Sequence, residues 1–506
     1  MEASIGTENE AEDDHYDSSY TTAEGTTGLK IVIDLESSPS TLPGHYIQSA
    51  APIPSRPSRD LITRGVITIE NARKYQRVYQ DRLDHFLYGP LGDYSNATFE
   101  EIQHKSPILG TVVCAIGALH SASADYESLY REFIGLSAAM SFSKTNVVDD
   151  VRALCIGAFW MSDLSSSLVS LAVRIATELQ LYRSFSKALQ GDREHYSRAR
   201  LYYLVYACDH HLSIPYGRPP ITRECEAIRD VRKFLTCKHA KEDDARLVSQ
   251  VLRWSVCTNV YDTFGADVDR ALSDDDIPKV RRFSIALDNL RVEWGERFTP
   301  NAHVGNYPRK GVSIQYHFAK LYLFSHALRG QSSNQAQPKS WDTDMELYEL
   351  ANSAILSAVS ILRAVVSDTE IQSFLNGLPT YFHVMIAFAV VFLLKMSTRF
   401  SNAFQMNVQE IQRLMSQLMN VLRSVSKTMH PRHLLIVIKD CLENALERNF
   451  PMTDTIFNDA PGFPHTFQAS EPNQGYRGDL FGDDTLNGYF LNEYDFLVNH
   501  FQEPAL

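Results

Sequence analysis

The 506-residue sequence lacks the short motifs that identify the common enzyme classes. It has no GxxxxGK[ST] phosphate loop, no GxGxxG after a strand, no HExxH zinc motif and no GxSxG nucleophile turn. These absences exclude the corresponding nucleotide, zinc-hydrolase and serine-hydrolase chemistries. They favour a protein that works by binding, and we expect no enzyme activity.

Closely spaced cysteines are also missing. The seven cysteines form no CxxC pair, and none precedes Cys114. Cys114, Cys155 and Cys208 each lie in an apolar run of helical period. This pattern is typical of reduced, buried thiols in an intracellular protein, and it offers no metal cluster.

Long apolar runs are scarce as well. The longest, Val384–Leu394, has eleven residues, which is too short to cross a bilayer and predicts a core helix. No apolar segment follows a basic start at the N-terminus, so the sequence gives no sign of secretion. We therefore expect no membrane partner.

Basic residues are sparse at both ends of the chain. The net charge is −13, and residues 1–50 carry ten acids against the single base Lys30. Residues 451–506 carry nine acids against Arg477, which leaves the central part close to neutral. Acidic ends disfavour contact with phosphates, so this composition argues against a self-sufficient DNA-reading protein.

Composition and periodicity predict three regions. Residues 1–58 are rich in acids, Ser, Thr and Pro and predict a disordered acidic head. Residues 59–450 show helical periods with short breaks and little strand-like alternation, which predicts an all-α protein built as a large irregular helical array. Residues 451–506 return to loop composition and predict an acidic, aromatic and disordered tail.

The segment Ala199–Pro220, ARLYYLVYACDHHLSIPYGRPP, is the most informative part of the sequence. Its aliphatic residues share one helical face, and three tyrosines widen that face until the helix is apolar nearly all round, which predicts a buried helix. Gly217 can adopt positive φ, and Pro219-Pro220 cannot continue a helix, so the helix must stop there.

This segment resembles the middle homology region of the fungal binuclear zinc-cluster transcription factors. His210 stands where that family usually has arginine. The Ala172-x-Arg174-x-Ala176 block within Asp150–Arg183 is similar to a second family signature and predicts two helices joined by a Ser/Asp turn. The matching positions of the first segment are Arg200, Tyr202, Tyr203, Tyr206, Asp209, Ser213, Gly217, Arg218 and Pro219.

The resemblance implies a nuclear transcription regulator with a helical regulatory domain. It also implies an N-terminal zinc cluster of six close cysteines, which this sequence does not contain. Either the chain is a cluster-less member or an upstream segment is missing from the sequence, and both explanations stay open. We expect no cofactor in this chain, with zinc only if such a segment exists.

Two metal-site interpretations compete with a structural one. Cys208-Asp209-His210-His211 could offer ligands on one helix, but no second ligand pair stands at a matching spacing. The Asp274–Asp276 run suggests a terpene-synthase magnesium motif, but Pro278 replaces its last carboxylate, so we expect a helix start. Arg218 could line a ligand pocket, or it could pair with Asp209 or a helix C-terminus and lock the turn.

The C-terminal tail carries the second functional prediction. Acids alternate with large apolar residues over Asp479–Phe501, and charge repulsion keeps the apolar groups available to a partner's groove. This pattern resembles the acidic activation segments of zinc-cluster factors; the alternative is an extension that packs on the helical array. The expected contact residues are Phe481, Leu486, Phe490, Leu491, Tyr494, Phe496 and Leu497.

A shorter pattern lies in the acidic head. The run Val32, Ile33, Asp34, Leu35 precedes Glu36 and resembles a motif that adds a strand to the small modifier SUMO. Such short patterns also arise by chance.

The sequence as a whole predicts a transcriptional regulator, and more specifically an activator of nutrient-utilisation or secondary-metabolite genes. Its partners would be the transcription machinery or a coactivator, and an intact zinc-cluster factor, with DNA contacted only indirectly or through a missing segment. The alternatives are a cluster-less co-regulator or dominant-negative paralogue, and an all-α enzyme with a divergent site.

Overall fold

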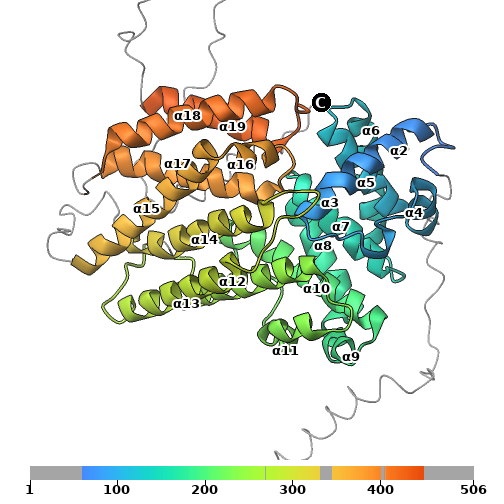
Figure 1. Ribbon diagram of the computed structural model, residues 1–506, viewed down its shortest axis with the longest axis horizontal. Coiled ribbons are helices and arrows are strands. Elements are labelled where there is room, and N and C mark those ends of the chain that lie inside the picture. The colour runs from blue at the N-terminus through green and yellow to red at the C-terminus, as the bar shows by residue number, and fades with distance from the viewer. Residues whose placement is uncertain (1–59, 268, 331–344, 401–403, 405, 450–506) are drawn as a thin grey trace, which may run out of the picture. The chain divides into compact units, whose positions relative to one another are not determined.

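The computed structural model describes residues 60–267, 269–330, 345–400, 404 and 406–449, and these residues are predominantly helical (Figure 1). No β-strand occurs within these ranges, where extended pairing is confined to one isolated bridge between Asn301 and Gly305. The predicted all-α class is confirmed. The predicted head and tail lie outside the described residues, so their disorder stays a prediction.

The α-helices vary from one turn to six turns in length, and short 3₁₀ segments join several of them. A π-helical turn, Tyr79–Leu83, connects α2 to α3. In chain order the α-helices are α2 (Ile69–Val78), α3 (Asp84–Phe86), α4 (Phe99–Lys105), α5 (Pro107–His120), α6 (Asp125–Met140), α7 (Val148–Trp160), α8 (Ser165–Glu178), α9 (Phe185–Leu189), α10 (Arg193–His211), α11 (Glu226–Arg229), α12 (Glu242–Phe264), α13 (Ile277–Gly295), α14 (Tyr307–Ser325), α15 (Met345–Ser367), α16 (Thr369–Phe374), α17 (Thr380–Arg399), α18 (Val408–Ser426) and α19 (Leu434–Asn449).

The N-terminal helices pack as neighbouring pairs. Helix α5 contacts α2, α4, α6 and α7, and α7 pairs with α8 as the Asp150–Arg183 pattern predicts. Thr68 caps α2 by accepting a hydrogen bond from the Asn71 amide. Helices α2 and α5 touch at Gly117, where an added Cβ would lie 2.1 Å from the Tyr75 carbonyl oxygen. Only glycine allows this approach.

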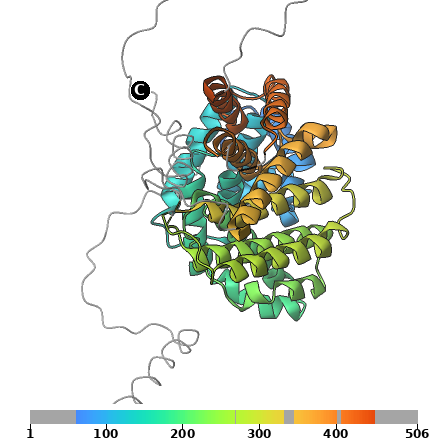
Figure 2. The same ribbon diagram turned by 90° about the vertical axis from the view of Figure 1, so that its left-hand side faces the viewer.

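The C-terminal helices form a second group of neighbours. Helix α14 lies between α13 and α15, α15 contacts α17 and α18, and α19 contacts both α17 and α18. In the view turned by 90°, the orange and red helices of this group lie above the green helices of the central part (Figure 2).

Two helices, α15 and α17, are long and apolar enough to span a membrane by length and composition alone. In α17, 94% of the apolar window Thr380–Thr398 is buried inside the helical array, and in α15 the share is 56%. The predicted core run Val384–Leu394 lies within α17, and every residue in it except Val391 is buried. Burial on this scale is what a core helix requires.

Helices α10 and α12 connect the two groups. Helix α10 contacts α7, α8 and α12, while α12 contacts α13 and α14. At the end of α10, the His211 ring stacks on Tyr381 of α17 with centroids 3.7 Å apart. The Trp254 indole of α12 donates a hydrogen bond of 3.3 Å to the same imidazole. One buried histidine therefore joins α10, α12 and α17.

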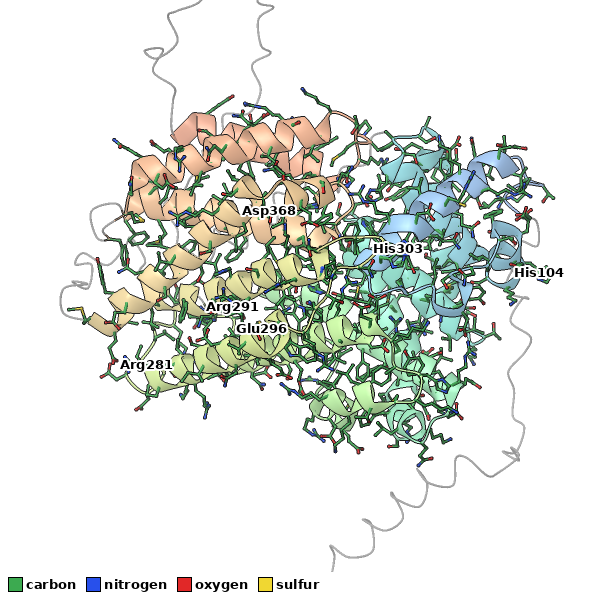
Figure 3. The ribbon with its side chains drawn as sticks, viewed as in Figure 1. His104, Arg281, Arg291, Glu296, His303 and Asp368 are labelled. Atoms are coloured by element: carbon green, nitrogen blue, oxygen red, sulfur yellow. The ribbon has the colours of Figure 1, made fainter. Side chains whose placement is uncertain are left out.

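Polar side chains fix several helix ends, among them Asp368, which is labelled in Figure 3. Asp368 caps α16 by accepting from the amides of Glu370 and Ile371, and it pairs with Lys310 of α14 at 2.6 Å. Asp276 stands at the start of α13, where Lys279 and Ser273 hold its carboxylate. The acidic run at 274–276 thus forms a helix start, as the sequence predicts.

The cysteines match the expected reduced state. Five of the seven are buried, Cys225 and Cys441 are partly exposed, and none of them forms a disulfide. Burial raises the pKa of the Cys114 thiol, and also that of Cys208, so both remain protonated at neutral pH.

Buried histidines make stability depend on pH. Burial lowers the pKa of His326 to about 3 and those of His210 and His383 to about 4, and it lowers that of His211 as well. An unfolded histidine titrates near pH 6.5, so below that pH only the unfolded chain binds these protons. Each site then costs about 1.4 kcal/mol of stability per pH unit. Burial also raises the pKa of Asp84 to about 7, which acts in the opposite direction and offsets one histidine.

We therefore expect the free energy of unfolding to fall by at least about 3 kcal/mol between pH 7.5 and pH 5. Reversible urea unfolding at constant ionic strength measures this change. A stability that stays level over this range would show that these histidines are not held neutral in the folded protein.

Candidate functional site

Helix α10 and the turn after it contain all nine residues singled out by the family resemblance. The Asp192 carboxylate caps the helix by accepting from the His195 amide at 2.9 Å. After His211 the chain enters a 3₁₀ turn, Ile214–Tyr216, and Gly217 follows with φ of +64°. The sequence predicts the helix stop at Gly217 and the two prolines, whereas α10 already ends at His211, before the 3₁₀ turn. Gly217 and the prolines then reverse the chain, so that residues 222–227 return along α10.

The three tyrosines of the motif bond to the returning segment. The Tyr206 hydroxyl donates to the Glu224 carboxylate at 2.9 Å, and the Tyr203 hydroxyl donates to the Ala227 carbonyl at 3.1 Å. The Tyr202 hydroxyl lies 3.8 Å from the Cys225 sulfur. Their rings fill the core while their hydroxyls satisfy groups on the neighbouring segment, which explains why tyrosine rather than phenylalanine suits these positions.

Asp209 makes the same connection nearer to the turn. Its side chain is fully buried and accepts from the Thr222 amide at 2.7 Å and from the Thr222 hydroxyl at 2.6 Å. The Ser213 hydroxyl donates to its other oxygen at 3.3 Å. The expected pairing with Arg218 is not formed, because the carboxylate faces the returning segment instead. We call these contacts of Asp209 and the tyrosines with residues 222–227 the α10 clamp.

Arg200 ties the first half of α10 to two other segments. Its Nε donates to the Asp244 carboxylate at 2.7 Å, and Asp244 is fully buried at the start of α12. Its two terminal nitrogens donate to the carbonyls of Tyr88 and Gly89. Burial opposes the guanidinium charge, but the negative charge of Asp244 prevails and raises the pKa of Arg200.

Only two of the nine motif residues are exposed. Arg218 lies with its guanidinium 5.7 Å from the centroid of the Tyr216 ring, and Pro219 follows it on the surface. Arg218 and Pro219 are therefore the motif residues that solvent reaches at this turn.

The Cys208–His211 run does not converge on a metal position. His210 stacks on Tyr206 and its Nδ1 lies 2.7 Å from the Tyr206 carbonyl, whereas His211 contacts Trp254 and Tyr381. In the described part of the chain, no group of three or more His, Cys, Asp or Glu side chains is arranged to hold a metal ion.

Sequence reasoning missed the partners of the motif. Thr222 and Glu224 stand shortly after the Pro-Pro stop, in the polar run Thr222-Arg223-Glu224, and no pattern in this run marks them as partners of α10. Asp244 belongs to the acidic first turn of α12, a pattern that indicates a helix start but not a long-range ion pair. The predicted tail contacts and the Val32–Leu35 motif lie outside the described residues and stay predictions.

Substitution of Asp209 tests whether the motif serves the fold. Asp209→Ala leaves the Thr222 amide without its buried acceptor and should lower the free energy of unfolding by about 2 to 3 kcal/mol. Asp209→Asn should cost less, because an amide oxygen can still accept from Thr222. Urea unfolding gives the energies, and hydrogen exchange at the Thr222 amide locates the loss.

The matched control is Arg223→Gln, which removes a charge from an exposed position of the same returning segment and should change stability by less than about 0.5 kcal/mol. Equal effects of Asp209→Ala and Arg223→Gln would contradict a buried clamp.

Comparison with known proteins gives one informative match. No protein-family model and no solved structure matches this chain. The transcriptional activator of proteases prtT of Emericella nidulans is 35% identical over 399 residues, which is 77% of this chain. The chain covers 59% of that relative's length. The relative is named as an activator of transcription and not as an enzyme, in agreement with the expectation from the sequence.

A match of this length must include much of the helical array described above. It confirms the resemblance, drawn from α10 and from the α7–α8 pair, to the fungal zinc-cluster transcription factors.

Proposed function

We propose that this chain is a nuclear transcriptional regulator that activates its target genes through protein–protein contacts. The observation that carries the proposal is the 35% identity, over 77% of the chain, to a protein named as a transcriptional activator. The relative is longer than this chain, so its whole activity is transferred here as part of the proposal.

The helical array would act as the regulatory and assembly platform. The motif residues of α10 support this role, because their side chains hold segments of the fold together. Seven of the nine lie at least partly inside the array, and the polar atoms of Arg200, Asp209 and Tyr206 are bonded within the protein. Such residues position surfaces for partners, and none is left in an open site as an acid, base or nucleophile.

The acidic tail would supply the activating contact. Phe490, Phe496 and Leu497 are the expected centre of this contact, since large apolar residues anchor most helix-in-groove complexes. The partner would be the transcription machinery or a coactivator.

The target genes would belong to the nutrient-utilisation class, and the name of the relative points to protease genes within it. Reading of DNA bases would be done by a six-cysteine module outside these 506 residues, whether in the same polypeptide or in a partner chain. The specific alternative is a co-regulator or dominant-negative paralogue that pairs with an intact zinc-cluster factor.

Reporter assays with fusions to a foreign DNA-binding domain test the activator proposal. The full chain should activate the reporter, and a fusion of residues 1–450 should not. Phe490→Ala, Phe496→Ala and Leu497→Ala together should abolish activation by the full chain, because they remove the apolar anchors and leave every acidic residue in place.

The control is Asn492→Ala with Asn499→Ala, which alters two polar tail residues and should leave activation unchanged. A silent full-length fusion that is expressed normally would contradict the activator role. Co-purification of that silent chain with an intact zinc-cluster factor would establish the co-regulator instead.

A further inference from the structure

A cleft of about 120 Å³ opens beside the first turns of α10, away from the α10 clamp. Its wall is formed by the loop between α3 and α4, by α7, by α10 and by the residues just before α12. The side chains that matter for its chemistry are Asp93, Arg152, Arg193, Arg200 and Lys241.

Four cations and one acid line this cleft, and three of the cations can form further hydrogen bonds or ion pairs. Arg200 is occupied by Asp244 and by two backbone carbonyls. Arg193 pairs with Asp93 at 2.8 Å on the surface, and Lys241 has no ion-pair partner among the described residues. Arg152 pairs with Asp149, but its Nε is buried and has no hydrogen-bond partner within the described protein. A buried donor without an acceptor is costly unless a ligand provides one.

The surroundings of the Asp93 carboxylate show that the cleft favours a negatively charged group. The Arg193 hydrogen bond lowers the pKa of Asp93, and the positive charges of Lys241 and Arg152 lower it further. Arg193 of α10, Lys241 before α12 and Arg152 of α7 therefore all place positive charge near the Asp93 carboxylate. The Asp93 side chain is 68% exposed, so it can turn into solvent and leave this position to another anion.

A wider and more open cleft of about 520 Å³ continues from the first and shares Asp93 and Arg152 with it. Its lining adds Tyr94, Asn96, Lys105 and the carboxylates of Glu101 and Asp149. Acids outnumber cations in this second cleft and disfavour a second anionic group, while their oxygens accept hydrogen bonds from hydroxyl groups. Lys105 and Arg152 each lie 5.6 Å from the centroid of the Tyr94 ring, so this ring supports the two cations.

We propose that the two clefts together bind a small hydroxylated ligand with one oxyanion head. The head, a phosphate or a carboxylate, lies against Arg152, Arg193 and Lys241 in place of Asp93. The neutral hydroxylated body lies along Asn96 and Glu101. This inference goes beyond the proposed function and does not depend on it.

Titration calorimetry on the purified full chain tests the site without DNA or any transcription partner. The probes are glucose 6-phosphate, gluconate, inorganic phosphate and glucose. We expect binding of glucose 6-phosphate or of gluconate, which identifies the head as phosphate or carboxylate, and no binding of glucose. Binding should weaken with added salt, because the head is held by charge.

Exposed residues provide variants that should fold normally. Arg193→Gln with Lys241→Gln should weaken binding about tenfold or more, since two charge-assisted contacts are lost. Asp93→Asn should tighten binding severalfold, because it removes the competing internal carboxylate. Arg413→Gln, which removes an exposed arginine of α18 outside the cleft, should bind as the parent does.

Several outcomes would overturn the proposal. It is wrong if no oxyanion probe binds, if Arg193→Gln with Lys241→Gln binds as tightly as the parent, or if Asp93→Asn weakens binding. Equal affinity for inorganic phosphate and glucose 6-phosphate would show that the hydroxylated part of the ligand does not contribute to binding.

Discussion

The buried ion pair between Arg200 and Asp244 is the contact on which the arrangement around α10 depends. Asp244 is inaccessible to solvent, and besides Arg200 it accepts hydrogen bonds from the Tyr196 hydroxyl at 2.6 Å and from the Lys241 amide at 2.7 Å. Arg200 in turn holds the carbonyls of residues 88 and 89. Desolvating two charges is favourable only when both are bonded as fully as this, so the pair fixes α10, α12 and the loop before α4 in one geometry.

That geometry separates residues that hold the fold from residues that can bind. Along α10, the buried tyrosines and Asp209 are occupied by the returning segment, and Arg200 is occupied by α12. The cleft beside the same helix is left with the less constrained cations Arg193 and Lys241 at its mouth. A helical array of this kind can keep a rigid interior and still vary its surface chemistry, because the two sets of side chains do not overlap.

Much of the fold follows from the sequence. The apolar face and tyrosines of Ala199–Pro220 predict a buried helix, because periodicity is a local constraint. Gly217 and the two prolines set an outer limit for that helix, which ends earlier, at His211. The pairing of α7 with α8 and the burial of Val384–Leu394 follow from the same kind of pattern. The hydrogen-bonding partners of the motif residues do not follow from the sequence. Arg218 stands nearer to Asp209 in the sequence than Thr222 does, yet Asp209 bonds to Thr222, and Asp244 lies 44 residues from Arg200.

The cleft lay beyond sequence reasoning for the same reason. Asp93, Arg152, Arg193 and Lys241 come from four separate segments, and no spacing in the chain relates them. Asp93 falls in a stretch that composition describes only as a loop. A polar site assembled from distant segments becomes visible only when the helices that carry it are placed together.

A double-mutant cycle on the ion pair tests the central claim most directly. Arg200→Met, Asp244→Asn and the double variant are compared with the parent by urea unfolding. Each single change should be strongly destabilising and the double change should cost much less than their sum, with a coupling of about 3 kcal/mol. A coupling near zero would contradict the claim that this pair holds α10, α12 and the preceding loop together.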